Sequence, residues 1–291
     1  MPVTANRDGF DDFLDALQEL LAKSYPHLVG LYEVFRHEAV FGWQWLNSSL
    51  SAVPPNGLIL EVGGGVMLLS SELQREGYEV TVLEPIGDGF SAFAELQDVV
   101  LGFARQRNHA PNVLAACVEN LQSKDTFDFA FSVNVMEHVE SVSKALVNVS
   151  MALKPAATYR FTCPNYLFPY EPHFNIPTVF SKELTERVFA RRIFGSSRVS
   201  DSRGVWNSLN WISVPMISRI VKTIPGVGVR FDRTIFSDAL DRVVTDDHFA
   251  SRRSMWVRIA AIFFVKTKLS KIFTWLPASL LPIVDCSVSR S

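Results

Sequence analysis

Three consecutive glycines, Gly63 to Gly65, follow an acidic residue, Glu61, at the end of an apolar run in the stretch LILEVGGGVMLLSSELQREGYEVTVLEP (58–85). A second apolar run ends at another acid, Glu84. Glycine weakens the end of a strand because it loses more backbone entropy on folding than any other residue. The pattern therefore predicts either a tight strand-to-helix turn or a ligand that lies against bare backbone.

A regular alternation of strands and helices surrounds this loop. Strands are predicted for the runs GLILEVG, YEVTVLEP, NVLAAC, FDFAFSVNV and ATYRFTCPN, and helices for residues 67–76, 90–106 and 141–153. Such spacing indicates right-handed crossovers and a parallel sheet. Ligands of open parallel sheets bind outside the carboxyl ends of the strands, which is where the glycines lie.

The flanking segments are predicted to be mostly helical. Residues 1–50 carry a helical apolar stripe and end at a breaker cluster, VPPNG (53–57). An aromatic and proline-rich loop (165–180) precedes helices over 182–193 and 206–223, a sixth strand over 226–236, a basic helical region and a last strand over 282–290. We expect one α/β domain with an N-terminal helical cover (1–55), a Rossmann-like core (56–165), and a loop, helical lid and last strands (166–291).

Composition narrows the functional classes. The chain has 291 residues, of which 48% are hydrophobic, so a packed core is expected rather than disorder. A net charge of −2 and the lack of a basic groove argue against a nucleic-acid partner. Three widely separated cysteines without CxxC spacing argue against a disulfide framework or a zinc knuckle. We expect a cytoplasmic protein, because no signal-peptide core or membrane-length apolar run occurs.

The glycine loop does not fit the common phosphate-binding patterns. Residues 63–68 read GGGVML rather than GxGxxG, and no Gly-Lys-Ser/Thr follows. An NAD-type oxidoreductase is therefore the less favoured alternative. The carboxylate of Glu84 could instead accept hydrogen bonds from both ribose hydroxyls of a nucleoside.

Four motifs in register carry a family resemblance. ILEVGGG, LEP, FDFAFSVNVMEHV and LKPAATYRFTCPN have the order and spacing seen in class I S-adenosylmethionine-dependent methyltransferases. Over about residues 55–165 the chain most resembles the ubiquinone-biosynthesis-type branch. The resemblance implies S-adenosylmethionine as cofactor, S-adenosylhomocysteine as its product, and a small or lipid-linked acceptor.

The resemblance also implies a set of cofactor-binding residues. Glu61 would organise the loop of Gly63, Gly64 and Gly65 and reach toward the methionine amino group, and Glu84 would bind the ribose. Adenine would be read by Glu119 or by backbone near Val118, and the backbone of Asn134 would line the methionine part. Two departures, Met67 for the third family glycine and Cys117 for a frequent Asp, keep an inactive binding or scaffold protein as an alternative.

Two histidines are candidate general bases. His138 follows the fourth strand, and His173 lies in the proline-framed loop with Tyr166, Tyr170 and Phe174. An imidazole titrates near neutral pH and could remove a proton from an acceptor hydroxyl. The alternative is a capping or packing role for each. Neither pairs with Cys or Asp at metal-ligand spacing, so no metal is expected. Methylation at O, N or C stays open.

The C-terminal segment allows two interpretations. Residues 252–291 contain seven Lys or Arg and one Asp, mixed with large apolar residues. Such a mixture suits a peripheral contact with an anionic membrane. The alternative is a lid with its basic face in water, which predicts that the apolar residues are buried. The oligomeric state is left open by the sequence.

Overall fold

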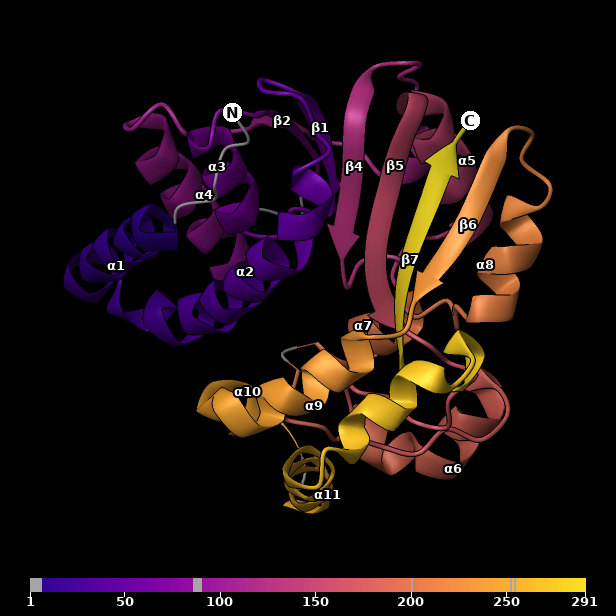
Figure 1. Cartoon of the computed structure of the whole chain (residues 1–291). Coiled ribbons are helices and arrows are strands. Elements are labelled where there is room, and N and C mark those ends of the chain that lie inside the picture. Colours follow the sequence, from indigo (N-terminus) through magenta and orange to yellow (C-terminus); the bar gives the residue numbers. More distant parts are fainter. Residues whose placement is uncertain (1–6, 86–90, 200, 252, 254) are drawn as a thin grey trace. The chain divides into compact units, whose positions relative to one another are not determined.

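The computed structural model describes residues 7–85, 91–199, 201–251, 253 and 255–291 (Figure 1). The chain forms two compact units, the first Met1–Ser132 with Met151–Ala157 and the second Val133–Ser150 with Thr158–Ser291. Among the described residues, no helix combines the length and apolarity that crossing a bilayer requires.

The first unit is built on parallel strands, as predicted. The register pairs Val62 with Leu83 and Leu83 with Leu114, so three strands end at one edge of the sheet. A fourth strand runs parallel to the first, with Glu61 opposite Phe131. The strands are β1 (Leu58–Val62), β2 (Glu79–Leu83), β3 (Asn112–Leu114) and β4 (Phe127–Val133).

Helices of the first unit follow the predicted apolar periodicity. Phe10, Leu14, Leu17 and Leu21 recur along one face of the first helix and are all buried. Phe90, where the sequence predicts the start of a helix, lies outside the described residues. The helices are α1 (Arg7–Ser24), η1 (Pro26–Leu28), α2 (Val29–Leu50), α3 (Leu68–Arg75), α4 (Ala92–Arg105) and η2 (Val118–Asn120).

The second unit contains antiparallel pairing. β7 (Ile283–Arg290) runs antiparallel to both β5 (Leu153–Pro164) and β6 (Val227–Asp232). Asp285 of β7 accepts hydrogen bonds from the guanidinium of Arg160, with an Nη2 to Oδ2 distance of 2.7 Å. The seven strands follow the order β3-β2-β1-β4-β5-β7-β6, which is the Rossmann-like mixed sheet expected from the sequence.

Helices inserted among the last strands make up much of the second unit, which confirms the predicted C-terminal helical insertion. One group lies between β5 and β6 and another between β6 and β7. The elements are α5 (Val142–Ala152) before β5, then α6 (Lys182–Phe194), α7 (Ser202–Ser208), α8 (Val214–Val221), α9 (Ile235–Thr245), α10 (Asp247–Ser251), α11 (Met255–Lys266), η3 (Leu269–Trp275) and η4 (Ala278–Leu280).

The single helix predicted over residues 206–223 is wrong, because two helices, α7 and α8, occupy this region. The amide of Asn210 donates hydrogen bonds to the carbonyls of Met136 (2.8 Å) and Val139 (2.9 Å). Trp211 has a left-handed backbone with φ of 59°, which a continuous helix cannot contain. Pro215 then lies in the first turn of α8, where its missing N–H costs nothing.

The sixth strand also ends earlier than predicted, at Asp232 rather than Phe236. The Asp232 carboxylate accepts hydrogen bonds from the backbone N–H (2.7 Å) and the hydroxyl (2.8 Å) of Thr234. This local turn stops the strand and places Ile235 at the start of α9.

Candidate cofactor and catalytic sites

The glycine loop at the end of β1 is a turn that requires left-handed backbone. Gly63 and Gly65 have φ of 73° and 54°, values that side chains disfavour. The N–H of Gly63 donates to the carbonyl of Leu83 at 2.8 Å, which ties the loop to the end of β2. Backbone geometry alone therefore accounts for two of the three glycines.

Gly64 is required for packing. A Cβ on Gly64 would lie 2.3 Å from Cγ1 of Val82 and 3.0 Å from Sδ of Met67. Val82 is a buried residue of β2, so it has no room to move away. The tight strand-to-helix turn, one of the two explanations offered for the glycines, is thus present. It brings the loop close to β2.

Met67 stands at the position of the third glycine in the resembled family. The backbone conformation of Met67 explains why that family has glycine there. Its φ is 66°, again in the left-handed region. Its N–H donates to the carbonyl of Gly64 at 2.9 Å, and its side chain is fully buried. Met67 therefore keeps the glycine-type turn at a conformational cost that its buried side chain offsets.

Two side chains hold this loop at Gly65, one of them a carboxylate and the other an amide. The N–H of Gly65 donates to Oε2 of Glu84 at 2.9 Å, so the acid at the end of β2 already holds the loop. On the other side, Nε2 of Gln97 donates to the carbonyl of Gly65 at 2.7 Å. No sequence signal pointed to Gln97, because it comes from the middle of α4 and belongs to no motif.

The carboxylates of Glu61 and Glu84 are held in an environment that disfavours their charge. Burial raises the pKa of Glu61 to about 8; a hydrogen bond with Ser70 opposes the shift, and the charge of Glu84 adds to it. Burial also raises the pKa of Glu84, against the opposing Gly65 N–H bond. Within the described residues, Oε2 of Glu61 has no hydrogen-bond partner. This pair of acids is therefore suited to a ligand that brings N–H or O–H donors.

The remaining predicted cofactor residues lie in two places. Val118 and Glu119 form the short helix η2 after β3, with Val118 buried and Cys117 exposed just before it. Asn134 follows β4 in the second unit, where its N–H donates to the carbonyl of Thr162 at 2.9 Å and its φ is 55°. The first unit thus brings together Glu61, Gly63, Gly64, Gly65, Glu84, Val118 and Glu119 at the carboxyl ends of its strands.

The two candidate histidines meet in the second unit, although 35 positions separate them in the sequence (173 − 138). Their ring centroids are 5.2 Å apart, in an edge-on arrangement. Nδ1 of His138 is 2.8 Å from the hydroxyl of Ser208. Nδ1 of His173 is 2.5 Å from Oε1 of Glu171.

Glu171 orients the proline-rich loop around His173. It is fully buried and accepts backbone N–H bonds from His173 (3.1 Å) and Phe174 (2.7 Å). The hydroxyl of Tyr166 also donates to it at 3.3 Å, and Tyr166 stacks on Trp211 at 4.4 Å between centroids. The buried Glu171 carboxylate therefore fixes Nδ1 of His173 and, with it, the orientation of the imidazole ring.

The histidine pair is joined by a buried acid, Glu137, that the sequence analysis did not select. One ligand atom from each of Glu137, His138 and His173 lies within 4.8 Å of the others, so the three could hold a metal ion. Burial lowers the pKa of His138 to about 4; the neighbouring His173 adds to the shift and Glu171 opposes it. His138 is therefore neutral at physiological pH. Sequence spacing could not reveal this cluster, because His173 reaches it only through tertiary folding.

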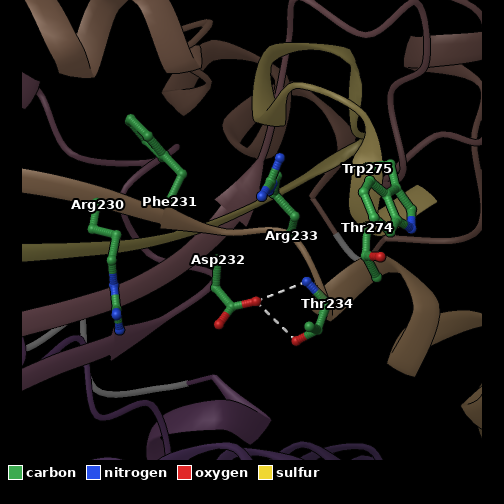
Figure 2. Close-up of a pocket in the computed structure, with 7 residues that line it drawn as sticks. All are labelled: Arg230, Phe231, Asp232, Arg233, Thr234, Thr274 and Trp275. Atoms are coloured by element: carbon green, nitrogen blue, oxygen red, sulfur yellow. Dashed lines mark hydrogen bonds between the residues drawn. The ribbon is translucent and has the colours of Figure 1, made fainter. Parts of the chain in front are cut away.

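A separate pocket lies elsewhere in the second unit. It has a volume of about 420 Å³ and contains none of the predicted cofactor or catalytic residues (Figure 2). It is formed by the end of β6 with the turn after it and by the end of η3, through Arg230, Phe231, Asp232, Arg233, Thr234, Thr274 and Trp275.

Comparison with known proteins agrees with this fold. Residues 38–181 match the family described as "Methyltransferase domain". A solved S-adenosylmethionine-dependent methyltransferase from Mesorhizobium loti has a TM-score of 0.52 at 15% identity, covering 85% of this chain and 97% of that one. Geranyl diphosphate C-methyltransferase from Streptomyces coelicolor A3(2) has a TM-score of 0.51 at 12% identity, covering 89% and 77%. At such identities the two structures show the shared fold alone.

The chain carries a methyltransferase domain over residues 38–181, which agrees with the resemblance to class I S-adenosylmethionine-dependent methyltransferases seen in its sequence motifs. Among its sequence relatives is the Mycobacterium tuberculosis protein Rv1509, described as uncharacterized, which is 43% identical over 280 residues, or 96% of this chain and 94% of its own length. The ubiquinone biosynthesis O-methyltransferase of Rickettsia bellii is 29% identical over 97 residues, which are 33% of this chain and 38% of that protein. This local match fits the ubiquinone-biosynthesis-type branch.

Proposed function

We propose that the first unit binds S-adenosylmethionine through the acid pair and the glycine loop between them. The supporting observation is the arrangement of Glu61, Gly65 and Glu84. No described residue donates a hydrogen bond to the buried Oε2 of Glu61, and Glu84 follows the end of β2. An ammonium group and ribose hydroxyls are the donors that such acids require. Backbone and side chains of Val118 and Glu119, in the same unit, would complete the binding of adenine.

The cofactor supplies an activated methyl group on a sulfonium, and the chain's own residues supply binding, orientation and proton removal. Glu84 would fix the ribose while still accepting the Gly65 N–H bond. Glu61 would become charged when a cationic group binds beside it, because a nearby opposite charge favours the ionised carboxylate. Holding both reactants in one geometry is the largest contribution the protein can make to methyl transfer.

We assign the general base to His173 rather than to His138. The low pKa of His138 makes it a weak proton acceptor. His173 instead has the buried Glu171 on Nδ1, a pairing that stabilises the imidazolium formed when Nε2 accepts a proton. His138 then serves to pack against and orient His173 at 5.2 Å between centroids.

The acceptor is proposed to be a small molecule, and more specifically a lipid-linked one with a hydroxyl or amine. Tyr166 and Phe174 of the histidine loop form an aromatic cluster with Trp206 and Trp211, with ring centroids 4.4 to 5.7 Å apart. The exposed apolar residues of α11 also support an acceptor that is reached from a membrane surface.

Labelled methyl transfer tests this proposal. The protein is incubated with S-adenosylmethionine carrying a labelled methyl group and with lipid and polar fractions from the native host. We expect label in the lipid fraction and none in RNA or protein. Calorimetry with S-adenosylmethionine, S-adenosylhomocysteine and NAD separates the alternatives. Cofactor affinity without methyl transfer would indicate a binding protein, and affinity for NAD alone would indicate an oxidoreductase.

The cluster of Glu137, His138 and His173 offers a second role for the histidines. One acid and two imidazoles are a ligand set that suits zinc or a similar ion, and their ligand atoms converge. The acid–base role predicts that a chelator leaves the rate of methyl transfer unchanged. A rate that falls with chelator and returns with one divalent metal would assign the cluster to metal binding instead.

A further inference from the structure

Helix α11 has one face that is anchored inside the second unit. Ala261 is fully buried in a cluster with Leu240, Val243 and Ala250. Phe264 and Val265 of the same helix pack against that cluster. These three positions of α11 occupy one side of the helix, so its orientation in the unit is fixed by them.

The opposite face of α11 is also apolar, and it is exposed. Met255, Ile259, Ile262 and Phe263 recur at i, i+4, i+7 and i+8, which places them on one side of the helix. The exposed fraction of Trp256 beside them is 75%, and that of Trp275 at the end of η3 is 83%. We call the following set the docking face: Met255, Trp256, Ile259, Ile262, Phe263, Ile272 and Trp275. Their exposure contradicts the plain lid interpretation, which predicted burial.

The charge around the docking face has one sign. Residues 255–284 contain four basic residues, Arg258, Lys266, Lys268 and Lys271, and no Asp or Glu. All four are exposed. Since the whole chain has a net charge of −2, the other residues together carry −2 − 4 = −6. The segment is therefore a local cationic region on an otherwise acidic protein.

We propose that the docking face binds the surface of an anionic lipid membrane. Large apolar side chains would enter the boundary between head groups and acyl chains, while the four cations pair with lipid phosphates. Trp256 and Trp275 have the amphipathic ring that favours this boundary. The contact is peripheral, because α11 has 12 residues and a spanning helix needs about 20.

A second copy of the chain fits this face less well. A symmetric contact would bring two docking faces together and oppose four cations with four cations. Like charges placed against each other cost several kcal/mol. An anionic membrane instead offers both an apolar layer and a matching charge, so charge complementarity selects it.

The pocket in Figure 2 places further phosphate-binding groups beside Trp275 of the docking face. Arg230 and Arg233 line this pocket, and guanidinium groups bind phosphate oxygens well. Its one carboxylate, Asp232, is engaged by the N–H and hydroxyl of Thr234. A lipid head group that enters from the docking face would therefore meet two cations.

Vesicle co-sedimentation tests the proposal with the full chain and without cofactor, so that the result is separate from methyl transfer. Phosphatidylcholine vesicles with and without phosphatidylglycerol are used across a salt series. We expect binding only with the anionic lipid, decreasing as salt rises. The variant Lys266/Lys268/Lys271→Glu should bind at least ~100-fold more weakly, since each cation contributes about a fivefold gain in affinity. Brominated phosphatidylglycerol should quench Trp fluorescence, and Trp256→Phe and Trp275→Phe should reduce the quenching.

A matched control carries the same charge change elsewhere. Lys124, Lys144 and Lys222 are exposed and lie outside α11 and η3, so Lys124/Lys144/Lys222→Glu should keep nearly full vesicle binding. Equal loss in both triple variants would overturn the proposal, because it would mean a general charge effect. It would also be overturned by equal binding to both kinds of vesicle, by no binding at low salt, or by a salt-stable oligomer that Ile259→Ser dissociates.

Discussion

The acid-and-glycine loop of the first unit and the histidine cluster of the second unit are built in different ways. The loop comes from one stretch, residues 58–85, and its backbone is held by the Gly63 bond to the Leu83 carbonyl and by the Gly65 bond to the Glu84 carboxylate. The histidine cluster joins side chains from three distant segments, around residues 138, 173 and 208. The first is therefore fixed mainly by local sequence, whereas the second depends on the packing of a long loop.

Their electrostatics differ in the same way. Burial raises the pKa values of Glu61 and Glu84, so the loop favours a ligand that brings positive charge or hydrogen-bond donors. Burial lowers the pKa of His138 to about 4, so this imidazole stays neutral. Burial thus disfavours the charged form of the two acids in the first region and of His138 in the second.

The largest expected effect falls on the histidine cluster. His173→Gln should lower the rate of methyl transfer to an O–H or N–H acceptor by ~10²–10⁴, while affinity for S-adenosylhomocysteine stays near normal. His27→Gln is the matched control, because His27 also pairs with an acid, Glu95 at 2.9 Å, but is exposed. Initial rates with the labelled cofactor give the comparison. Equal rates for wild type and His173→Gln would remove the base from the account.

The next effect falls on the loop. Gly64→Ala should lower the free energy of unfolding by ~1–3 kcal/mol, because the added Cβ would lie 2.3 Å from Cγ1 of Val82. The control is Gly102→Ala in α4, where a Cβ meets nothing within 4 Å and helix propensity predicts a gain of ~0.5–1 kcal/mol. Urea unfolding measures both. If Gly64→Ala proved as stable as Gly102→Ala, the loop would not be packed against β2 as described.

The same contrast explains what the sequence could predict. The loop follows from local rules, since strand ends, glycines and acids at fixed spacing lie at one sheet edge whenever the strands are parallel. The roles of Gly64, Gln97 and Met67 could not be predicted from the sequence, because they depend on tertiary contacts with β2 and α4. Sequence spacing could not show that the segments carrying Glu137–His138 and Glu171–His173 meet, and it gave one helix where the amide of Asn210 and the left-handed Trp211 enforce two.

A smaller effect should appear in the pH dependence of stability. The pKa of Glu61 in the folded protein, about 8, lies above its ordinary value of 4.5, so the folded state binds this proton more tightly than the unfolded state. The free energy of unfolding contributed by Glu61 is therefore present below pH 4.5 and is lost as pH rises to 8. Relative to Glu61→Gln, wild type should lose ~1–2 kcal/mol over that range, less than the full shift because buried charges recruit water. A difference that stays constant with pH would contradict a buried, mostly protonated Glu61.

The central claim is that Glu84 and the glycine loop hold the nucleoside of S-adenosylmethionine, and titration calorimetry with S-adenosylhomocysteine tests it most directly. Wild type should bind, and Glu84→Ala should bind ~10–150-fold more weakly, the loss expected when a hydrogen bond to a charged group is removed. Glu79→Ala, at the exposed start of the same strand β2, should bind like wild type. Equal affinity of Glu84→Ala and wild type, with circular dichroism showing both folded, would contradict the account.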